Sequence, residues 1–258
     1  MFFKNNFPTG KYSELDPKHI LSTLDKLRQR IDLRFPGSGL GKLAGEMNEV
    51  AFVIVDLVIK LSRPLWSIRF LTFIAIGLLI GLSVWLCTIT VRYIPAGESG
   101  LMEILQGAES AINEVIFLTL AILFFATLEN RIKRKTALDS LHRLRSLAHV
   151  VDMHQLTKDP AYLLENGIDS HFSEKRKMTP VELTRYLDYC TELLAINSKL
   201  AALHVQHLQD SEVLNTVNEV EMLSHELSNK IWQKIMMLDV VITSDEKGAE
   251  TKDVGTKA

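Results

Sequence analysis

The sequence predicts an all-α protein in which a transmembrane helical hairpin is attached to a cytoplasmic helical bundle. The first observation is an uncharged tract of 22 residues, Phe70–Val91, which as a helix is long enough to span the hydrocarbon layer of a bilayer. A second apolar tract, Val115–Leu128, approaches membrane length when it is extended back to Ala111. Elsewhere apolar residues recur at steps of three and four, and no series of segments alternates with a two-residue period, so a sheet is not expected.

Residues 1–42 are expected to form a cytoplasmic segment with one short amphipathic helix. Asp16–Pro17 has the pattern of an N-cap followed by proline at the first helical position, and the helix should end near Leu33. The stretch Pro36–Lys42 that follows resembles a phosphate-binding loop, but it lacks the first glycine and the hydroxyl residue after the lysine. No strand is expected before it either, so we interpret it as an interhelical loop.

Residues 43–63 predict an amphipathic helix that lies in the membrane interface. The segment is strongly apolar, yet four charged residues share one of its faces: Glu49, Asp56, Lys60 and Arg63. A narrow charged stripe of this kind is typical of a helix in the interface or packed against the base of a hairpin. A third membrane span is the alternative, and it would move the amino terminus across the membrane.

The hairpin occupies residues 64–128, with spans at about 70–91 and 111–128. Basic residues gather just before the first span and just after the second span, whereas the connecting loop, 92–110, holds only Arg92. Because loops rich in Lys and Arg stay on the inner side of the membrane, both termini are expected in the cytoplasm.

Gly77 and Gly81 form a G-x-x-x-G pair in the first span. The pair removes side-chain bulk from one helix face and lets another backbone approach closely. Two partners fit this pattern, namely Ala121 or Ala126 of the second span, or the same face of a second copy.

Glu114 is a candidate pore residue. We interpret it as a hydrated carboxylate at the headgroup level, since a charge at the bilayer centre is costly and nothing polar continues along Val115–Leu128. In an oligomer, a ring of such carboxylates could instead select cations.

Four basic residues, Arg131, Lys133, Arg134 and Lys135, directly follow the second span. They predict a topology anchor in contact with anionic lipid headgroups, which attract each cation by ~1 kcal/mol. Nucleic acid is not an expected partner, because the net charge is -2 and no aromatic residues interleave these bases.

Residues 129–242 predict the helical bundle. The second membrane helix should continue into it, because no Gly or Pro occurs from Glu129 to Asp159. A seam at steps of four and three predicts packing or self-association through Leu141, Leu144 and Val151. A short helix after Asp159–Pro160 and a polar loop at 168–178 should follow.

Two long antiparallel helices should complete the bundle. The first begins at the capping sequence Thr179–Glu182 and ends near Leu208, and the second begins after Asp210–Ser211. The tail, residues 243–258, has too little apolar content to fold and is expected to be disordered.

Five residues are candidate metal ligands: His142, His149, Asp152, His204 and His207. Imidazoles and a carboxylate from two helices could bind zinc or iron, but no H-E-x-x-H or E-x-x-H motif accompanies them. We therefore expect no metal, no cofactor and no catalytic residue, and we expect His204 to be a hydrogen-bonded core residue. Cys87 and Cys190 lie in different predicted parts, so no disulfide is predicted.

The tracts Leu141–Pro160 and Lys230–Ile235 resemble those of a family of uncharacterised bacterial two-span inner-membrane proteins with a cytoplasmic helical domain. The resemblance implies a bacterial inner-membrane location and transfers no functional residue. The sequence thus predicts a non-enzymatic anchor or scaffold whose bundle binds a second copy or a cytoplasmic protein. A homo-oligomeric channel or transport subunit, with the second span lining the pore, is the alternative.

Overall fold

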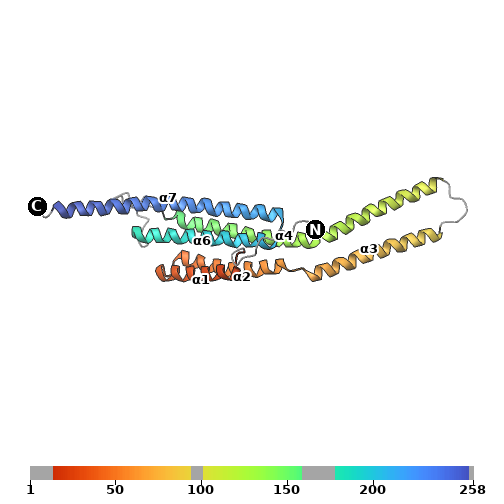
Figure 1. Cartoon of the computed structure of the whole chain (residues 1–258), viewed down its shortest axis with the longest axis horizontal. Coiled ribbons are helices and arrows are strands. Elements are labelled where there is room, and N and C mark those ends of the chain that lie inside the picture. Colours follow the sequence, from red (N-terminus) through yellow and green to blue (C-terminus); the bar gives the residue numbers. More distant parts are fainter. Residues whose placement is uncertain (1–13, 94–100, 159–177, 256–258) are drawn as a thin grey trace. The chain divides into compact units, whose positions relative to one another are not determined.

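The computed structural model describes residues 14–93, 101–158 and 178–255, and within these ranges the chain is helical and contains no strand. The all-α prediction is therefore confirmed. Figure 1 shows the helices, which are α1 (Pro17–Arg34), α2 (Gly39–Ser62), α3 (Trp66–Tyr93), α4 (Leu101–Leu156), α6 (Pro180–His207) and α7 (Ser211–Gly255).

The chain divides into two compact units. One, which we call the bundle unit, consists of Met1–Ser62 and Ala137–Ala258, and the other, the hairpin unit, consists of Arg63–Thr136. The predicted short helix after Asp159 and most of the predicted loop at 168–178 lie outside the described residues.

In the bundle unit, α1 begins and ends as its sequence predicts. The Asp16 side chain accepts a hydrogen bond from the Lys18 amide at 2.9 Å, and Pro17 occupies the first turn. The turn between α1 and α2 places Gly37 at a φ of +69°, where a side chain would be strained. At Gly41 an added Cβ would lie 2.5 Å from Asp32 Oδ1, so a side chain there would require the Asp32 carboxylate to move.

The helix expected in the membrane interface at 43–63 is instead a bundle helix. Ten residues of α2 are buried, among them Met47, Ala51 and Ile54, and α2 packs against both α1 and α6. The charged stripe does lie on its exposed face, where Asp56 pairs with Lys60 at 2.6 Å. A solvated face of a bundle helix and the polar face of an interfacial helix have the same sequence pattern, so the pattern alone did not distinguish them.

The final two helices also begin as predicted. Thr179 and Glu182 form a capping box at the start of α6. The end of α7 differs from the prediction, because the helix continues through most of the tail 243–258 to Gly255. Extending an existing helix costs far less than nucleating a new one, and no proline interrupts these residues.

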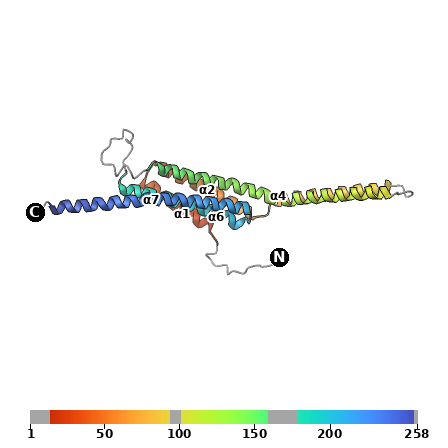
Figure 2. The same ribbon diagram turned by 90° about the horizontal axis from the view of Figure 1, so that it is seen from above.

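The seam predicted on α4 is part of the core of the bundle unit. Leu141, Leu144 and Val151 are each fully buried, together with Ala137 and Ala148. The prediction that these residues pack is correct, but they are covered by this chain and are not free for self-association. Figure 2 shows α1, α2, α6, α7 and the C-terminal part of α4 running along one another in this unit.

Replacing a residue of this seam should destabilise the bundle strongly. We expect Leu144→Ala to lower the free energy of unfolding by about 2 to 5 kcal/mol, because it leaves a cavity in a closed core. Met153→Ala on the same helix, where the side chain is 62% exposed, should change it by less than about 0.5 kcal/mol. Urea unfolding of the solubilised protein, followed by circular dichroism, measures both, and equal losses would contradict the assignment of the core.

Candidate functional site

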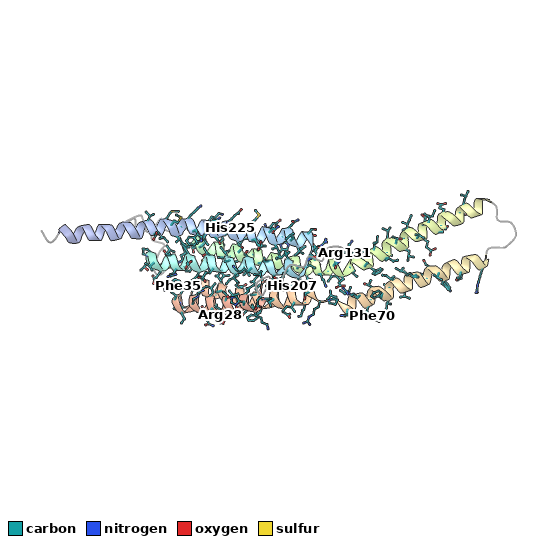
Figure 3. The ribbon with its side chains drawn as sticks, viewed as in Figure 1. Arg28, Phe35, Phe70, Arg131, His207 and His225 are labelled. Atoms are coloured by element: carbon teal, nitrogen blue, oxygen red, sulfur yellow. The ribbon has the colours of Figure 1, made fainter. Side chains whose placement is uncertain are left out.

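The hairpin unit exposes large apolar side chains along both of its helices. Trp66 and Phe70 of α3 are 76% and 69% exposed, and Phe117 of α4 is 72% exposed; Figure 3 shows Phe70 projecting from the ribbon. Two helical stretches, within Gly39–Trp85 and Leu105–Leu156, are long and apolar enough to cross a membrane, and the most apolar window of each has no buried residue. The core helix of a soluble protein would instead be mostly buried.

The G-x-x-x-G face of α3 is open. A Cβ added at Gly77 or Gly81 would meet no heavy atom within 4 Å among the described residues. Packing against Ala121 or Ala126, one of the two predicted partners, would place atoms of α4 there. The other predicted partner, a second copy, remains compatible with this open face.

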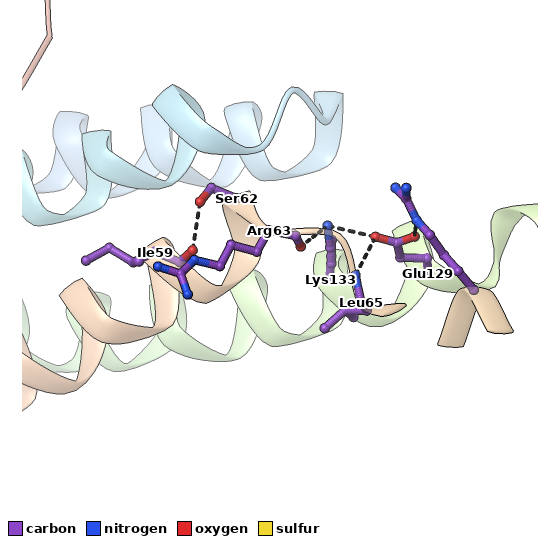
Figure 4. A network of polar contacts seen from close by, with 7 residues as sticks. Ile59, Ser62, Arg63, Leu65, Glu129 and Lys133 are labelled. Atoms are coloured by element: carbon purple, nitrogen blue, oxygen red, sulfur yellow. Dashed lines mark hydrogen bonds and ion pairs between the residues drawn. The ribbon is translucent and has the colours of Figure 1, made fainter. Parts of the chain in front are cut away.

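A polar network joins the two helices at the base of the hairpin unit, the end that contains Arg63 and Lys133, as Figure 4 shows. Glu129 of α4 accepts hydrogen bonds from the Leu65 amide at 3.2 Å and from Arg69 Nε at 2.7 Å. Lys133 Nζ lies 2.9 Å from Glu129 Oε1 and donates to the Arg63 carbonyl oxygen, also at 2.9 Å. The network thus ties the segment before α3 to two successive turns of α4.

This network changes the role predicted for Lys133. Its side chain is only 10% exposed and both of its polar contacts are within the hairpin unit, so it is not free to bind a lipid headgroup. Arg131 and Lys135 are exposed, and the Arg131 guanidinium lies 5.6 Å from the centre of the Phe124 ring. Arg134 is half-buried. The four basic residues therefore have two roles: Lys133 forms an internal ion pair, whereas Arg131 and Lys135 form an exposed cationic edge. The sequence alone did not distinguish these roles.

The pKa of Glu129 is low because of this network. Burial alone would raise the pKa, but hydrogen bonds from Arg69, Lys133 and the Leu65 amide outweigh it and lower the pKa from 4.5 to about 2. Glu129 is therefore a carboxylate at neutral pH, and it lies one residue beyond the apolar tract Val115–Leu128.

Glu114 lies deeper along the hairpin than the sequence suggested. α4 begins at Leu101, about ten residues before the predicted start of the second span. Two contacts fix the antiparallel register of α3 and α4: Arg69 meets Glu129, and Ser83 donates a hydrogen bond to Glu114. Ser83 lies inside the uncharged tract Phe70–Val91, so Glu114 is level with apolar residues of α3 and is not at the end of the hairpin.

Glu114 ends a polar stripe on the first part of α4. The stripe recurs at steps of three and four, on one side of the helix, and all its members are exposed: Gln106, Glu109, Ser110, Asn113 and Glu114. Below Glu114 the same side of the helix continues with Phe117 and Phe124, which are both exposed. The first part of α4 is therefore polar on one side and apolar on the other, and the polar side stops at aromatic residues.

The five candidate metal ligands do not come together. His142 and His149 are exposed, and Asp152 accepts a hydrogen bond from Gln155. Among the described residues, no group of three or more His, Cys, Asp or Glu side chains has an arrangement that could hold a metal ion. His207 is half-buried at the end of α6.

His204 is a core residue, in the environment that its position on the apolar stripe indicates. Its Nε2 lies 2.6 Å from Ser140 Oγ of α4, and its Nδ1 lies 3.1 Å from the Leu200 carbonyl oxygen. Burial lowers the pKa of His204, although hydrogen bonds to the Ala201 and Leu200 carbonyls partly oppose this. The imidazole therefore links α6 to α4 inside the bundle unit.

A second polar link between bundle helices was not predicted. Lys234 Nζ of α7 donates to Gln155 Oε1 of α4 at 2.7 Å. The Cys190 thiol is free and fully buried, and this burial raises its pKa to about 12, with a smaller opposing effect from Lys234. The signal in the sequence for the Lys234–Gln155 link is that Gln155 continues the seam of α4, four residues after Val151.

The outward face of α7 carries a stripe that no residue of this chain covers within the described residues. Its members recur at steps of three and four and are all exposed: Met222, His225, Asn229, Trp232 and Met236. We call this set the outer stripe of α7; Figure 3 shows His225 on the side of α7 away from the other helices of its unit. The opposite face of α7, with Val217, Val220 and Leu227, is buried against the bundle.

Comparisons with protein-family models, with curated proteins and with solved structures found no match to this chain. The resemblance to bacterial two-span proteins therefore gains no support.

The base network predicts a pH dependence that can be measured at one amide. Since the pKa of Glu129 falls from 4.5 to about 2 in the folded protein, its stabilising contribution is complete above about pH 5 and is lost as the pH falls towards 2. We expect the hydrogen-exchange protection of the Leu65 amide, corrected for intrinsic rates, to decrease over this range. In Glu129→Gln the protection should already be low at pH 7 and nearly independent of pH.

A matched control is Glu219→Gln, which removes an exposed ion pair with Arg145 in the bundle unit and should leave the Leu65 amide unchanged. The same acid sensitivity in Glu129→Gln would show that another group is responsible.

Proposed function

We propose that this protein is an integral membrane anchor whose helical bundle self-associates through the outer stripe of α7. The observation that best supports self-association is the stripe itself. Trp232 and Met236 are 53% and 67% exposed, on a helix whose opposite face is already buried. Three of its five members are large apolar residues, and exposed apolar residues grouped on one face mark interaction surfaces.

The spacing of the stripe favours a second helix of the same kind as its partner. Steps of three and four between successive members are those of a coiled-coil seam, and Asn229 stands within the apolar row, where a single polar residue specifies register in such seams. A second copy brings an identical stripe, as a two-fold interface requires. At 45 residues, α7 is also much longer than the 28-residue α6 on which it packs.

A membrane location follows from the hairpin unit in this proposal. Water would face the apolar side chains of α3 and α4 at a large free-energy cost, whereas lipid would not. The exposed cations Arg131 and Lys135, with the interfacial aromatic residue Trp66, would contact anionic headgroups at the end of the hairpin where α4 leaves the membrane. By the positive-inside rule this side is the cytoplasm, and in a bacterium the membrane is the inner membrane.

Self-association can be tested by weakening the outer stripe. Trp232→Ala combined with Met236→Ala should weaken association by about tenfold or more, because buried aromatic anchors dominate helix interfaces. The measurement is the molar mass of the detergent-solubilised full-length protein as a function of concentration. Val181→Ala on α6, which also removes an exposed apolar side chain, is the matched control and should leave the mass unchanged. A strictly monomeric wild-type protein, with no second copy captured by crosslinking in cells, would overturn the proposal.

A second candidate function, an ion channel or transport subunit, is supported by the polar stripe of α4. A row from Gln106 to Glu114 cannot face lipid without cost, and in an oligomer it would line a water-filled entrance. Phe117 and Phe124 continue the same side and would form a hydrophobic constriction below it. The acidic members Glu109 and Glu114 favour cations over anions.

Ion flux in liposomes that contain the purified protein tests this second candidate. We expect a cation flux that Glu114→Gln reduces at least tenfold, because the substitution removes the charge nearest the constriction. Glu219→Gln in the bundle unit serves as a control and should leave the flux unchanged. Vesicles without flux, or a flux that Glu114→Gln does not alter, would exclude a pore lined by this stripe.

A further inference from the structure

Within the described residues, Ser83 and Glu114 form the only side-chain hydrogen bond between the uncharged tract of α3 and α4. The Ser83 hydroxyl donates to Glu114 Oε1. Ser83 is half-buried and Glu114 is exposed, so the contact lies at the edge of the pair of helices and not between them. One carboxylate oxygen and one hydroxyl oxygen thus face the same small volume from two helices.

The register places this contact well inside the apolar layer. Ser83 lies about 21 Å along α3 from Arg69, and about 12 Å from the last residue of the uncharged tract, Val91, at ~1.5 Å per residue. The residues next to Ser83 in sequence are Leu82 and Val84, which are 53% and 58% exposed. In a membrane, lipid chains would surround these side chains, so Glu114 would be at the depth of hydrocarbon.

No cation of the hairpin unit lies at this depth. Its basic side chains are at the base, where Arg69 and Lys133 are engaged by Glu129, and at the far end of α3, where Arg92 is nine residues beyond Ser83. No ion pair to Glu114 is present within the described residues. A carboxylate in hydrocarbon without a positive partner is so unfavourable that such groups usually mark binding sites for ions or protons.

We propose that Glu114 and Ser83 form a binding site for one monovalent cation, a proton or Na⁺, within the membrane. A proton would neutralise the carboxylate and leave Oε1 to accept the Ser83 hydrogen bond. A sodium ion would take the carboxylate oxygen and the Ser83 Oγ as ligands, with the hydroxyl hydrogen turned away. The polar stripe, from Gln106 to Asn113, leads from the N-terminal end of α4 to this site and supplies its access from water.

The inference depends on the proposed membrane location of the hairpin unit but not on self-association through α7. It also deepens the second candidate function, since it names the ion class and the residue that would bind it. The simpler interpretation, that the contact only holds the two helices together, predicts no effect of Na⁺ on Glu114 and the pH response of an ordinary carboxyl group.

Labelling with a carbodiimide tests the site directly. The reagent adds the carboxyl O–H across one of its C=N bonds, so it needs a protonated carboxyl group, and a bound sodium ion blocks it. Full-length protein in liposomes is treated with lipid-soluble dicyclohexylcarbodiimide or with a water-soluble carbodiimide, and the labelled residue is identified by mass spectrometry. We expect the lipid-soluble reagent to label Glu114 much faster than the water-soluble reagent.

The cation is identified by the conditions that slow the labelling. Slower labelling with added Na⁺ at constant pH, and not with added choline, assigns a sodium site. Labelling that persists at neutral pH, slows only as the pH rises further and is unaffected by Na⁺ assigns a proton site, because an ordinary carboxyl group is already deprotonated there. Labelling confined to acidic pH and unaffected by Na⁺, labelling by the water-soluble reagent that is as fast as by the lipid-soluble one, or no labelling of Glu114 would overturn the proposal.

Two variants separate this proposal from the others. Ser83→Ala should weaken the protection by the cation about fivefold, the equilibrium equivalent of one ordinary hydrogen bond, while the labelled position stays the same. Glu219→Gln, in the bundle unit, should leave the labelling of Glu114 unchanged. Extraction of the same vesicles with alkaline carbonate tests the membrane location separately. Protein that stays in the pellet but shows no cation effect would overturn only the ion site, whereas protein that is released would overturn the membrane location and the site together.

Discussion

The exposed apolar surface of the hairpin unit is the constraint on which the other features depend. Along α3 and the first half of α4 of the described chain, side chains such as Phe70 and Phe117 point outward and no part of the chain covers them. Hydrating this surface costs free energy. In the proposed membrane location lipid would surround it, and both segments suit that location because they are helices, whose backbone groups are bonded internally. The two carboxylates differ in their position along this surface: Glu129 lies at its end, whereas Glu114 lies within it.

Glu129 and Glu114 are carboxylates of the same helix in opposite circumstances. Glu129 receives three hydrogen bonds, two of them from cations, and its low pKa records that the charge is stabilised. Glu114 receives one, from the neutral hydroxyl of Ser83. The first arrangement is self-sufficient and structural, whereas in the proposed membrane location the second leaves a charge without a cationic partner among the described residues. This difference is why the proposed ion site is placed at Glu114.

Much of the helical organisation could be predicted from sequence because it is encoded locally. The Asp16–Pro17 start, the capping box at Thr179 and the seam through Leu144 are patterns within one or two turns, and each forms as expected. Partners could not be predicted, because a row of apolar residues does not state what covers it. The seam of α4 is covered by its own chain, α2 packs in the bundle, and the pairing of Lys133 and the depth of Glu114 depend on residues about 30 to 70 positions away.

The buried Cys190 thiol offers an internal gauge of the bundle's integrity. With a pKa near 12, almost none of it is thiolate at neutral pH, and the surrounding side chains exclude reagents from the sulfur. Alkylation of this sulfur in an intact cell would therefore require the helices to separate first. The rate at which a small electrophile modifies Cys190 therefore reports the opening of the bundle, without purification or an introduced probe.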